Sequence, residues 1–108
     1  MDARSMLMRA GLGVALCLTL SQPALAQDAN LARNLAATCA NCHGTNGQAQ
    51  GDMKPLAGLG ADKIVAMVAD YKSGAQPATI MHQIAKGYTD EQIRLIAGYF
   101  AAQRPAAK

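Results

Sequence analysis

The stretch from residue 39 to residue 43 reads Cys39-Ala40-Asn41-Cys42-His43, two thiols and an imidazole at a spacing that can hold a metalloporphyrin. C-x-x-C-H is the attachment sequence of c-type haem. The two thiols add to the two vinyl groups of the porphyrin, and the histidine that follows lies under the iron as its proximal ligand. Cys39 and Cys42 are therefore predicted to carry one covalently bound haem c, with His43 on its iron.

Two other chemistries use a C-x-x-C pair. A thioredoxin-type dithiol attacks disulfides through a low-pKa thiolate, but it belongs to a fold with βαβ units, and this chain shows no strand pattern. A zinc site needs a second pair of ligands, whereas the chain after residue 43 holds one histidine and no cysteine. Haem attachment is the favoured interpretation.

The second axial ligand of the iron decides what the haem does. A methionine thioether favours ferrous iron and raises the reduction potential, which suits electron transfer, while a vacant position would admit oxygen or peroxide. Met81 is the predicted ligand because it follows a turn at Pro77 and is well separated from His43 in the chain. His82 is the alternative, since adjacent helical residues point about 100° apart and cannot both face the iron. Bis-histidine ligation would lower the potential.

Two further methionines compete with Met81. Met67 falls on the apolar face of a predicted helix, where a methionine usually serves as core. Met53 is close in sequence to the proximal histidine, which makes the opposite haem face awkward to reach. The Nδ1 proton of His43 also needs an acceptor, because that hydrogen bond orients the ring and tunes its basicity. Pro55 is predicted to supply this carbonyl, since proline fixes the backbone and removes a competing donor.

The elements that position these residues are helical. Apolar residues recur at helical spacing in four segments, which predicts an all-α domain. Asp62 is expected to cap the second helix and Thr89 the last, with Gln92 completing a capping box. Gly44 to Gly60 forms a glycine-rich loop of unusual length, and the chain is expected to fray from Gln103. The predicted helices cover residues 28–39, 62–72, 80–86 and 89 to a point before Pro105.

The first 26 residues have the pattern of a secretory signal: Arg4 and Arg9, then an apolar run from residue 10 to residue 20, then Ala24-Leu25-Ala26 as a cleavage site. The run is shorter than the roughly 20 apolar residues that a membrane span needs. The sequence thus predicts a signal peptide over 1–26, a single periplasmic domain over 27–108, and no membrane span.

Composition narrows the function classes. The 108-residue chain carries a formal net charge of +3 and has no Lys/Arg cluster, so a nucleic-acid partner is not expected. Both cysteines outside the predicted signal lie in the haem motif, which leaves none for a structural disulfide. A domain this small usually needs a staple to be stable, and the haem is expected to be that staple.

Taken together, the residues resemble class I cytochrome c along the whole predicted domain. The matching features are the Cys39–Gly44 motif, the Pro55-Leu56-Ala57-Gly58 loop, a distal methionine and Tyr99-Phe100 in the last helix. The resemblance implies three to five helices wrapped around one covalent haem, with the first and last helices crossing beside it and an aromatic residue packed at the crossing. It also implies a proline carbonyl, here that of Pro55, as partner of the proximal histidine.

A narrower resemblance lies in Thr79–Thr89, which is similar to the distal segment of the cytochrome subunit of flavocytochrome c sulfide dehydrogenase, above all in Ala85-Lys86-Gly87-Tyr88. In that family the methionine at the place of Met81 is the sixth ligand. The resemblance implies a monohaem subunit, not catalytic alone. Its partner would be an FAD-containing flavoprotein that oxidises sulfide, and its electron acceptor a downstream cytochrome or oxidase.

Two alternatives stay open at this point. One is a free-standing electron shuttle of the c5 or c553 type that serves an oxidase or another dehydrogenase. The other is a haem enzyme or sensor whose sixth ligand can be displaced.

Overall fold

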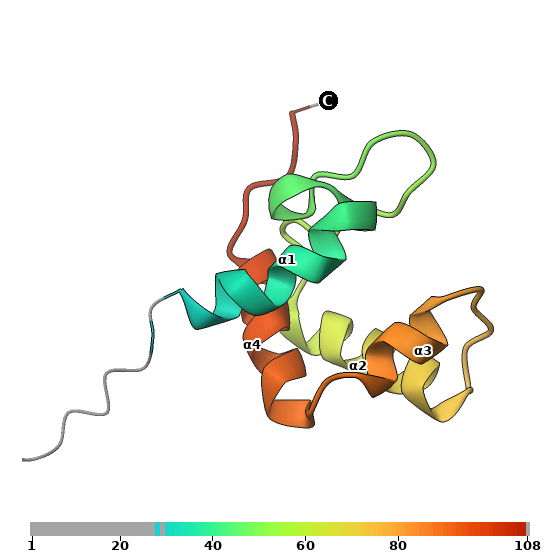
Figure 1. Ribbon diagram of the computed structural model, residues 1–108. Coiled ribbons are helices and arrows are strands. Elements are labelled where there is room, and N and C mark those ends of the chain that lie inside the picture. The colour runs from blue at the N-terminus through green and yellow to red at the C-terminus, as the bar shows by residue number, and fades with distance from the viewer. Residues whose placement is uncertain (1–27, 29, 108) are drawn as a thin grey trace, which may run out of the picture.

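The computed structural model describes residues 28 and 30–107, and the predicted signal segment falls outside this range. In the described part of the chain the regular structure is helical, which confirms the all-α prediction (Figure 1). None of the helices described there is long and apolar enough to cross a membrane. The elements are α1 (Leu31–His43), the 3-10 turn η1 (Thr45–Gly47), α2 (Ala61–Ser73), α3 (Met81–Lys86) and α4 (Asp90–Ala101).

The first and last helices pack across each other, and α2 packs against both α4 and α3 (Figure 1). Small side chains permit the close approach of α1 and α4, since Ala36 in α1 and Ala97 in α4 are both buried. Phe100 is fully buried beside them and is the largest side chain of the core. Ile64 of α2 and Ile96 of α4 extend this core toward the second helix pair. The folded domain therefore depends on contacts between the two ends of the described chain.

The helix boundaries follow local chemistry, with one correction. At the start of α4, Gln92 N donates to Thr89 Oγ1 at 3.2 Å and Thr89 N donates to Gln92 Oε1 at 2.9 Å, which confirms the predicted capping box. Asp62 was expected to cap α2, but Gly60 holds that position and Asp62 lies in the first turn. A carboxylate in the first turn still interacts favourably with the positive end of the helix dipole. Asp62 therefore does mark the start of α2, but the predicted N-cap was wrong by two residues.

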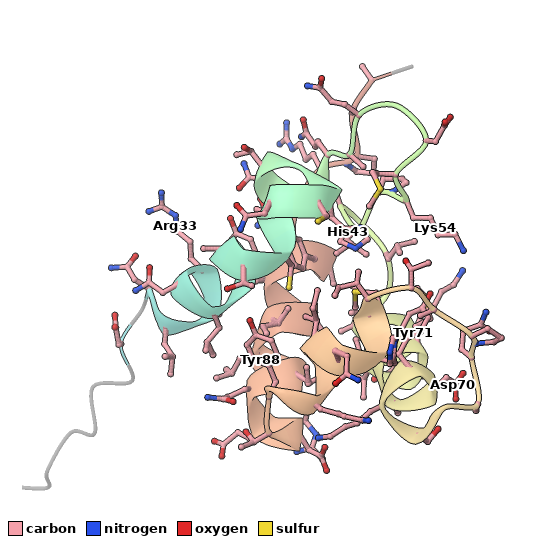
Figure 2. All side chains as sticks on the ribbon, turned by 45° about the vertical axis from the view of Figure 1, so that its right-hand side comes forward. Arg33, His43, Lys54, Asp70, Tyr71 and Tyr88 are labelled. Atoms are coloured by element: carbon pink, nitrogen blue, oxygen red, sulfur yellow. The ribbon has the colours of Figure 1, made fainter. Side chains whose placement is uncertain are left out.

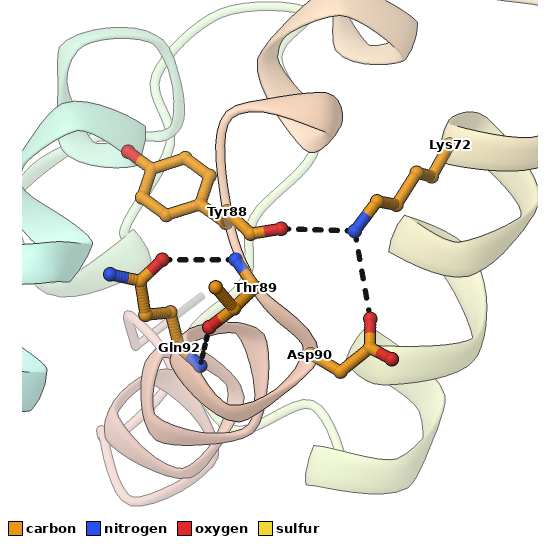
Figure 3. A network of polar contacts seen from close by, with 5 residues as sticks. All are labelled: Lys72, Tyr88, Thr89, Asp90 and Gln92. Carbon is orange, nitrogen blue, oxygen red and sulfur yellow. Dashed lines mark hydrogen bonds and ion pairs between the residues drawn. The ribbon is translucent and has the colours of Figure 1, made fainter.

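A lysine joins α2 to the connection between α3 and α4 (Figure 3). Lys72 Nζ donates to the carbonyl of Tyr88 at 3.0 Å and lies 3.6 Å from Asp90 Oδ1. The ion pair is largely exposed and contributes little by itself. The hydrogen bond to a backbone carbonyl has the clearer role, because it fixes the end of the short segment that carries Met81.

The residues after α4 pack against the long loop. Gln48 Nε2 donates to the carbonyl of Arg104 at 3.1 Å, and Gly58 N donates to the carbonyl of Phe100 at 3.0 Å. A Cβ added at Gly58 would come within 2.7 Å of Pro105 Cγ. The chain was expected to fray from Gln103, but residues 103–105 are held against the loop, so this expectation is wrong for them. The loop supplies partners that no local pattern reveals.

Candidate haem site

The motif residues lie on one helical face. Helix α1 continues through the motif to His43, so Cys39, Cys42 and His43 stand at positions i, i+3 and i+4, which share a face of an α-helix. All three line a cavity of about 270 Å³. One rigid helix end thus delivers both thiols and the imidazole to the same space.

The remaining walls of this cavity come from the loop before α2 and from the helices α2, α3 and α4. The loop before α2 contributes Leu56, α2 contributes Ile64 and Tyr71, and α4 contributes Phe100. The lining is mostly apolar, so a flat macrocycle would be held by burial of hydrophobic surface. Burial also raises the pKa of the Cys39 thiol above its ordinary value, which keeps this sulfur in the neutral form.

The imidazole of His43 is oriented by the chain itself. His43 Nδ1 donates to the carbonyl of Lys54 at 2.7 Å, and the two labelled residues lie side by side in Figure 2. With Nδ1 engaged as a donor, Nε2 is the nitrogen left to bind a metal. Such a carbonyl partner raises the basicity of a ligating histidine.

The predicted acceptor is wrong by one residue. The carbonyl that accepts from His43 belongs to Lys54, and not to Pro55. Proline still has a part in this arrangement, because its ring drives the preceding residue toward extended backbone conformations. Pro55 therefore acts on the conformation of Lys54, the residue that carries the accepting oxygen.

Replacing Pro55 with alanine is expected to raise the reduction potential. A relaxed Lys54 carbonyl binds His43 less firmly, the imidazole donates less to ferric iron, and the ferric state loses stability. If the ferric state loses about 1 kcal/mol of stability relative to the ferrous state, the potential rises by roughly 40 mV for a one-electron couple. The measurement is a spectroelectrochemical titration, with Lys54→Arg as a control that keeps charge, carbonyl and proline. An unchanged potential in Pro55→Ala would show that the proline has no such influence.

The three candidate methionines, Met53, Met67 and Met81, all line the cavity, so the structure brings the competing ligands together. Met53 is 44% exposed and directly precedes Lys54, which places its backbone beside the proximal histidine. Met67 lies on α2 between Ile64 and Tyr71, on the face that forms the cavity wall. Met81 is the first residue of α3 and lines the cavity from that helix.

His82 has a different place. It is half-buried and does not belong to the cavity lining. Its Nδ1 atom is buried without a hydrogen-bond partner among the described residues. His82 therefore does not share the cavity lining with the motif residues and the three candidate methionines.

The donor set fits haem c. Two thiols and an imidazole share a helical face, the imidazole presents Nε2, the walls are apolar, and thioether sulfur is available. The Lys54 carbonyl has no local signal in the sequence, and α1 continues four residues beyond its predicted end at residue 39.

Comparisons with known proteins agree with this site. The family model described as cytochrome c matches residues 29–103. The chain is 41% identical over 66 residues to the cytochrome subunit of sulfide dehydrogenase of Chlorobaculum tepidum, a match that covers 61% of this chain and 60% of that protein. It is 34% identical over 82 residues to cytochrome c-554(548) of Halomonas halodenitrificans, covering 72% of this chain and 99% of that protein.

A third relative is longer. Cytochrome c4 of Pseudomonas aeruginosa is 34% identical over 95 residues, which cover 84% of this chain and 47% of that protein. The chain therefore spans about 60% of the sulfide dehydrogenase subunit and about half of cytochrome c4. The family match, the helical fold and the arrangement of the motif lead to one conclusion. The chain belongs to the cytochrome c family, and it is a class I cytochrome c with covalently bound haem c.

Proposed function

We propose that this protein is the haem subunit of a sulfide-oxidising flavoprotein and that it works in the periplasm. The observation that carries the proposal is its 41% identity to a cytochrome subunit of sulfide dehydrogenase. The flavoprotein would perform the two-electron oxidation of sulfide. This chain would accept the electrons singly and pass them to a downstream cytochrome or oxidase. Export through residues 1–26 belongs to the same proposal.

The residues of the site have separate tasks in this function. Bound haem supplies a one-electron redox couple. Cys39 and Cys42 would fix it covalently, and His43, held by the Lys54 carbonyl at 2.7 Å, would ligate its iron on the proximal side. Met81 would provide the sixth ligand and favour the reduced state. The apolar walls would keep water from a bound haem, which would limit the solvent reorganisation that accompanies each electron.

The mouth of the cavity favours a stable interface over a transient encounter. Met53 and Ile80 line the cavity and are 44% and 53% exposed, although both are large apolar side chains. Asp52 and Lys54, also in the lining, carry opposite charges, so the mouth lacks a charge of one sign for long-range steering. An apolar patch depleted in net charge resembles the core of a lasting protein interface.

The test is to purify the tagged protein from its native host and to record the absorption spectrum of what accompanies it. Flavin bands beside the haem bands, bleached when sulfide is added, are the expected result. Haem bands alone would exclude a stable subunit. They would support a diffusible shuttle, for which the match to 99% of cytochrome c-554(548) is the favouring observation.

Replacing Ile80 with lysine is expected to weaken binding to the flavoprotein at least tenfold, or about 1.4 kcal/mol, since a charge would replace apolar surface in the interface. Titration of the purified partner by calorimetry gives the affinity. Leu31→Lys is the matched control, because Leu31 is also a large exposed apolar residue (37%) but does not line the cavity. An equal loss of affinity in both variants would show that the cavity mouth is not the docking surface. The absorption spectrum of each variant separates weaker docking from a disturbed haem.

A further inference from the structure

We propose that Tyr99 is a positioning residue for the proximal ligand: through Asn46 its hydroxyl holds the turn that keeps the Lys54 carbonyl against His43. The inference rests on the proposed role of His43 as the iron ligand. It goes beyond that role, because it assigns control of the ligand's hydrogen bond to a side chain on α4.

The contact begins between two residues far apart in the chain. Tyr99 Oη donates to Asn46 Oδ1 at 2.6 Å across a separation of 53 positions. Asn46 has φ 55°, and it is the non-glycine residue with positive φ in the part of the chain that the structure describes. Asparagine tolerates this left-handed conformation better than most residues, although it costs free energy. The tyrosine hydroxyl thus binds a residue held in a sparsely populated conformation.

The next step runs from Asn46 to its neighbour in the turn η1. The Gly47 carbonyl accepts from Leu56 N at 2.9 Å and from Ala57 N at 3.1 Å. A Cβ at Gly47 would come within 2.7 Å of Ala57 N and 2.8 Å of Phe100 Cδ1, and its φ of 74° also suits glycine. The turn is therefore seated tightly between the loop and α4.

The last step reaches the ligand. Leu56 and Ala57, anchored on Gly47, follow Lys54 in the chain, and the Lys54 carbonyl accepts from His43 at 2.7 Å. The donor, His43, precedes the same turn, because α1 ends there and Gly44 leads directly into η1. The turn thus connects both sides of the His43–Lys54 hydrogen bond, and Tyr99 fixes the turn from outside.

The hydroxyl can be removed with little other change. The ring of Tyr99 packs edge-to-face on Phe100, with centroids 5.3 Å apart and planes at 73°, and this packing survives in phenylalanine. In Tyr99→Phe the His43 Nδ1 proton is expected to exchange with solvent at least threefold faster. The reduction potential is expected to rise, because a weaker hydrogen bond makes the imidazole a weaker donor to ferric iron.

The experiment uses the haem-loaded protein labelled uniformly with ¹⁵N, so that the His43 ring and the backbone amides are observed in one sample. NMR gives the exchange rate of the Nδ1 proton, and spectroelectrochemistry gives the potential. The backbone amide of the buried Ile96 reports opening of the whole fold, and its exchange is expected to accelerate less than that of the Nδ1 proton. Asn46→Gly, which suits the positive φ and deletes the acceptor, is expected to give the same changes, and the double variant no more than either single one.

Tyr88→Phe is the matched control, because it removes a hydroxyl from another tyrosine that packs against the core. The proposal is overturned if Tyr99→Phe and Asn46→Gly leave Nδ1 exchange and the potential at wild-type values. It is equally overturned if Tyr88→Phe reproduces both changes, or if Nδ1 and Ile96 exchange accelerate in equal proportion, since that describes general loosening.

Discussion

Replacing Met81 with alanine is expected to turn a low-spin haem into a high-spin one and to lower the reduction potential by a few tenths of a volt, within the roughly 0.8 V that axial ligands span. Loss of the thioether leaves the ferrous state without the ligand that favours it. The absorption spectrum of the ferric protein and a redox titration measure the two effects.

The controls for this prediction are the two other methionines of the cavity. Met67→Ala and Met53→Ala remove thioethers from the same cavity, and both are expected to stay low-spin. A high-spin spectrum in Met67→Ala with an unchanged Met81→Ala would transfer the ligand role to α2. If Met81→Ala alters neither spectrum nor potential, the sixth position is open or displaceable, and the haem enzyme or sensor becomes the better interpretation.

Replacing both Cys39 and Cys42 with alanine is expected to abolish covalent haem attachment and, with it, the stable fold. The cavity of about 270 Å³ would be left without its contents. At roughly 24 cal/mol per Å³ this costs on the order of 6 kcal/mol, which is comparable to the whole stability of a small domain. The core residues that face the cavity, Ile64 and Phe100 among them, would lose their packing partner.

Two measurements check this prediction. The pyridine haemochrome spectrum distinguishes thioether-bonded from unmodified haem, and circular dichroism reports helix content. Cys42→Ala is the graded control, because Cys39 can still form one thioether and the fold should be partly retained. A double variant that keeps full helicity without haem would contradict the idea that haem completes the core.

Much of the fold could be predicted because its signals are local. The capping box of Thr89 and Gln92 fixes the start of α4, and the apolar face of that helix is visible in the sequence around Phe100. The motif itself names Cys39, Cys42 and His43 with a spacing that few other sites share. For these residues, neighbouring positions contain all the needed information.

What could not be predicted depends on contacts between distant residues. Proline at position 55 shows that a donor is missing, but it does not show which carbonyl turns toward the histidine, and the acceptor proved to be Lys54. The pair Tyr99–Asn46 has no local pattern at all, because its members meet only when α4 crosses α1. The same holds for the residues after α4, which were expected to fray. The hydrogen bond from Gln48 to the Arg104 carbonyl joins them to a distant loop, and no local pattern predicts it.

The crossing of α1 and α4 imposes an order on biosynthesis. A ribosome makes the amino-terminal end first, so α1 is complete before the helix that packs across it. During that interval the core beside Cys39 stays open, because Phe100, its largest buried side chain, has not yet been made. The domain can therefore close its core only when its last helix has been synthesised.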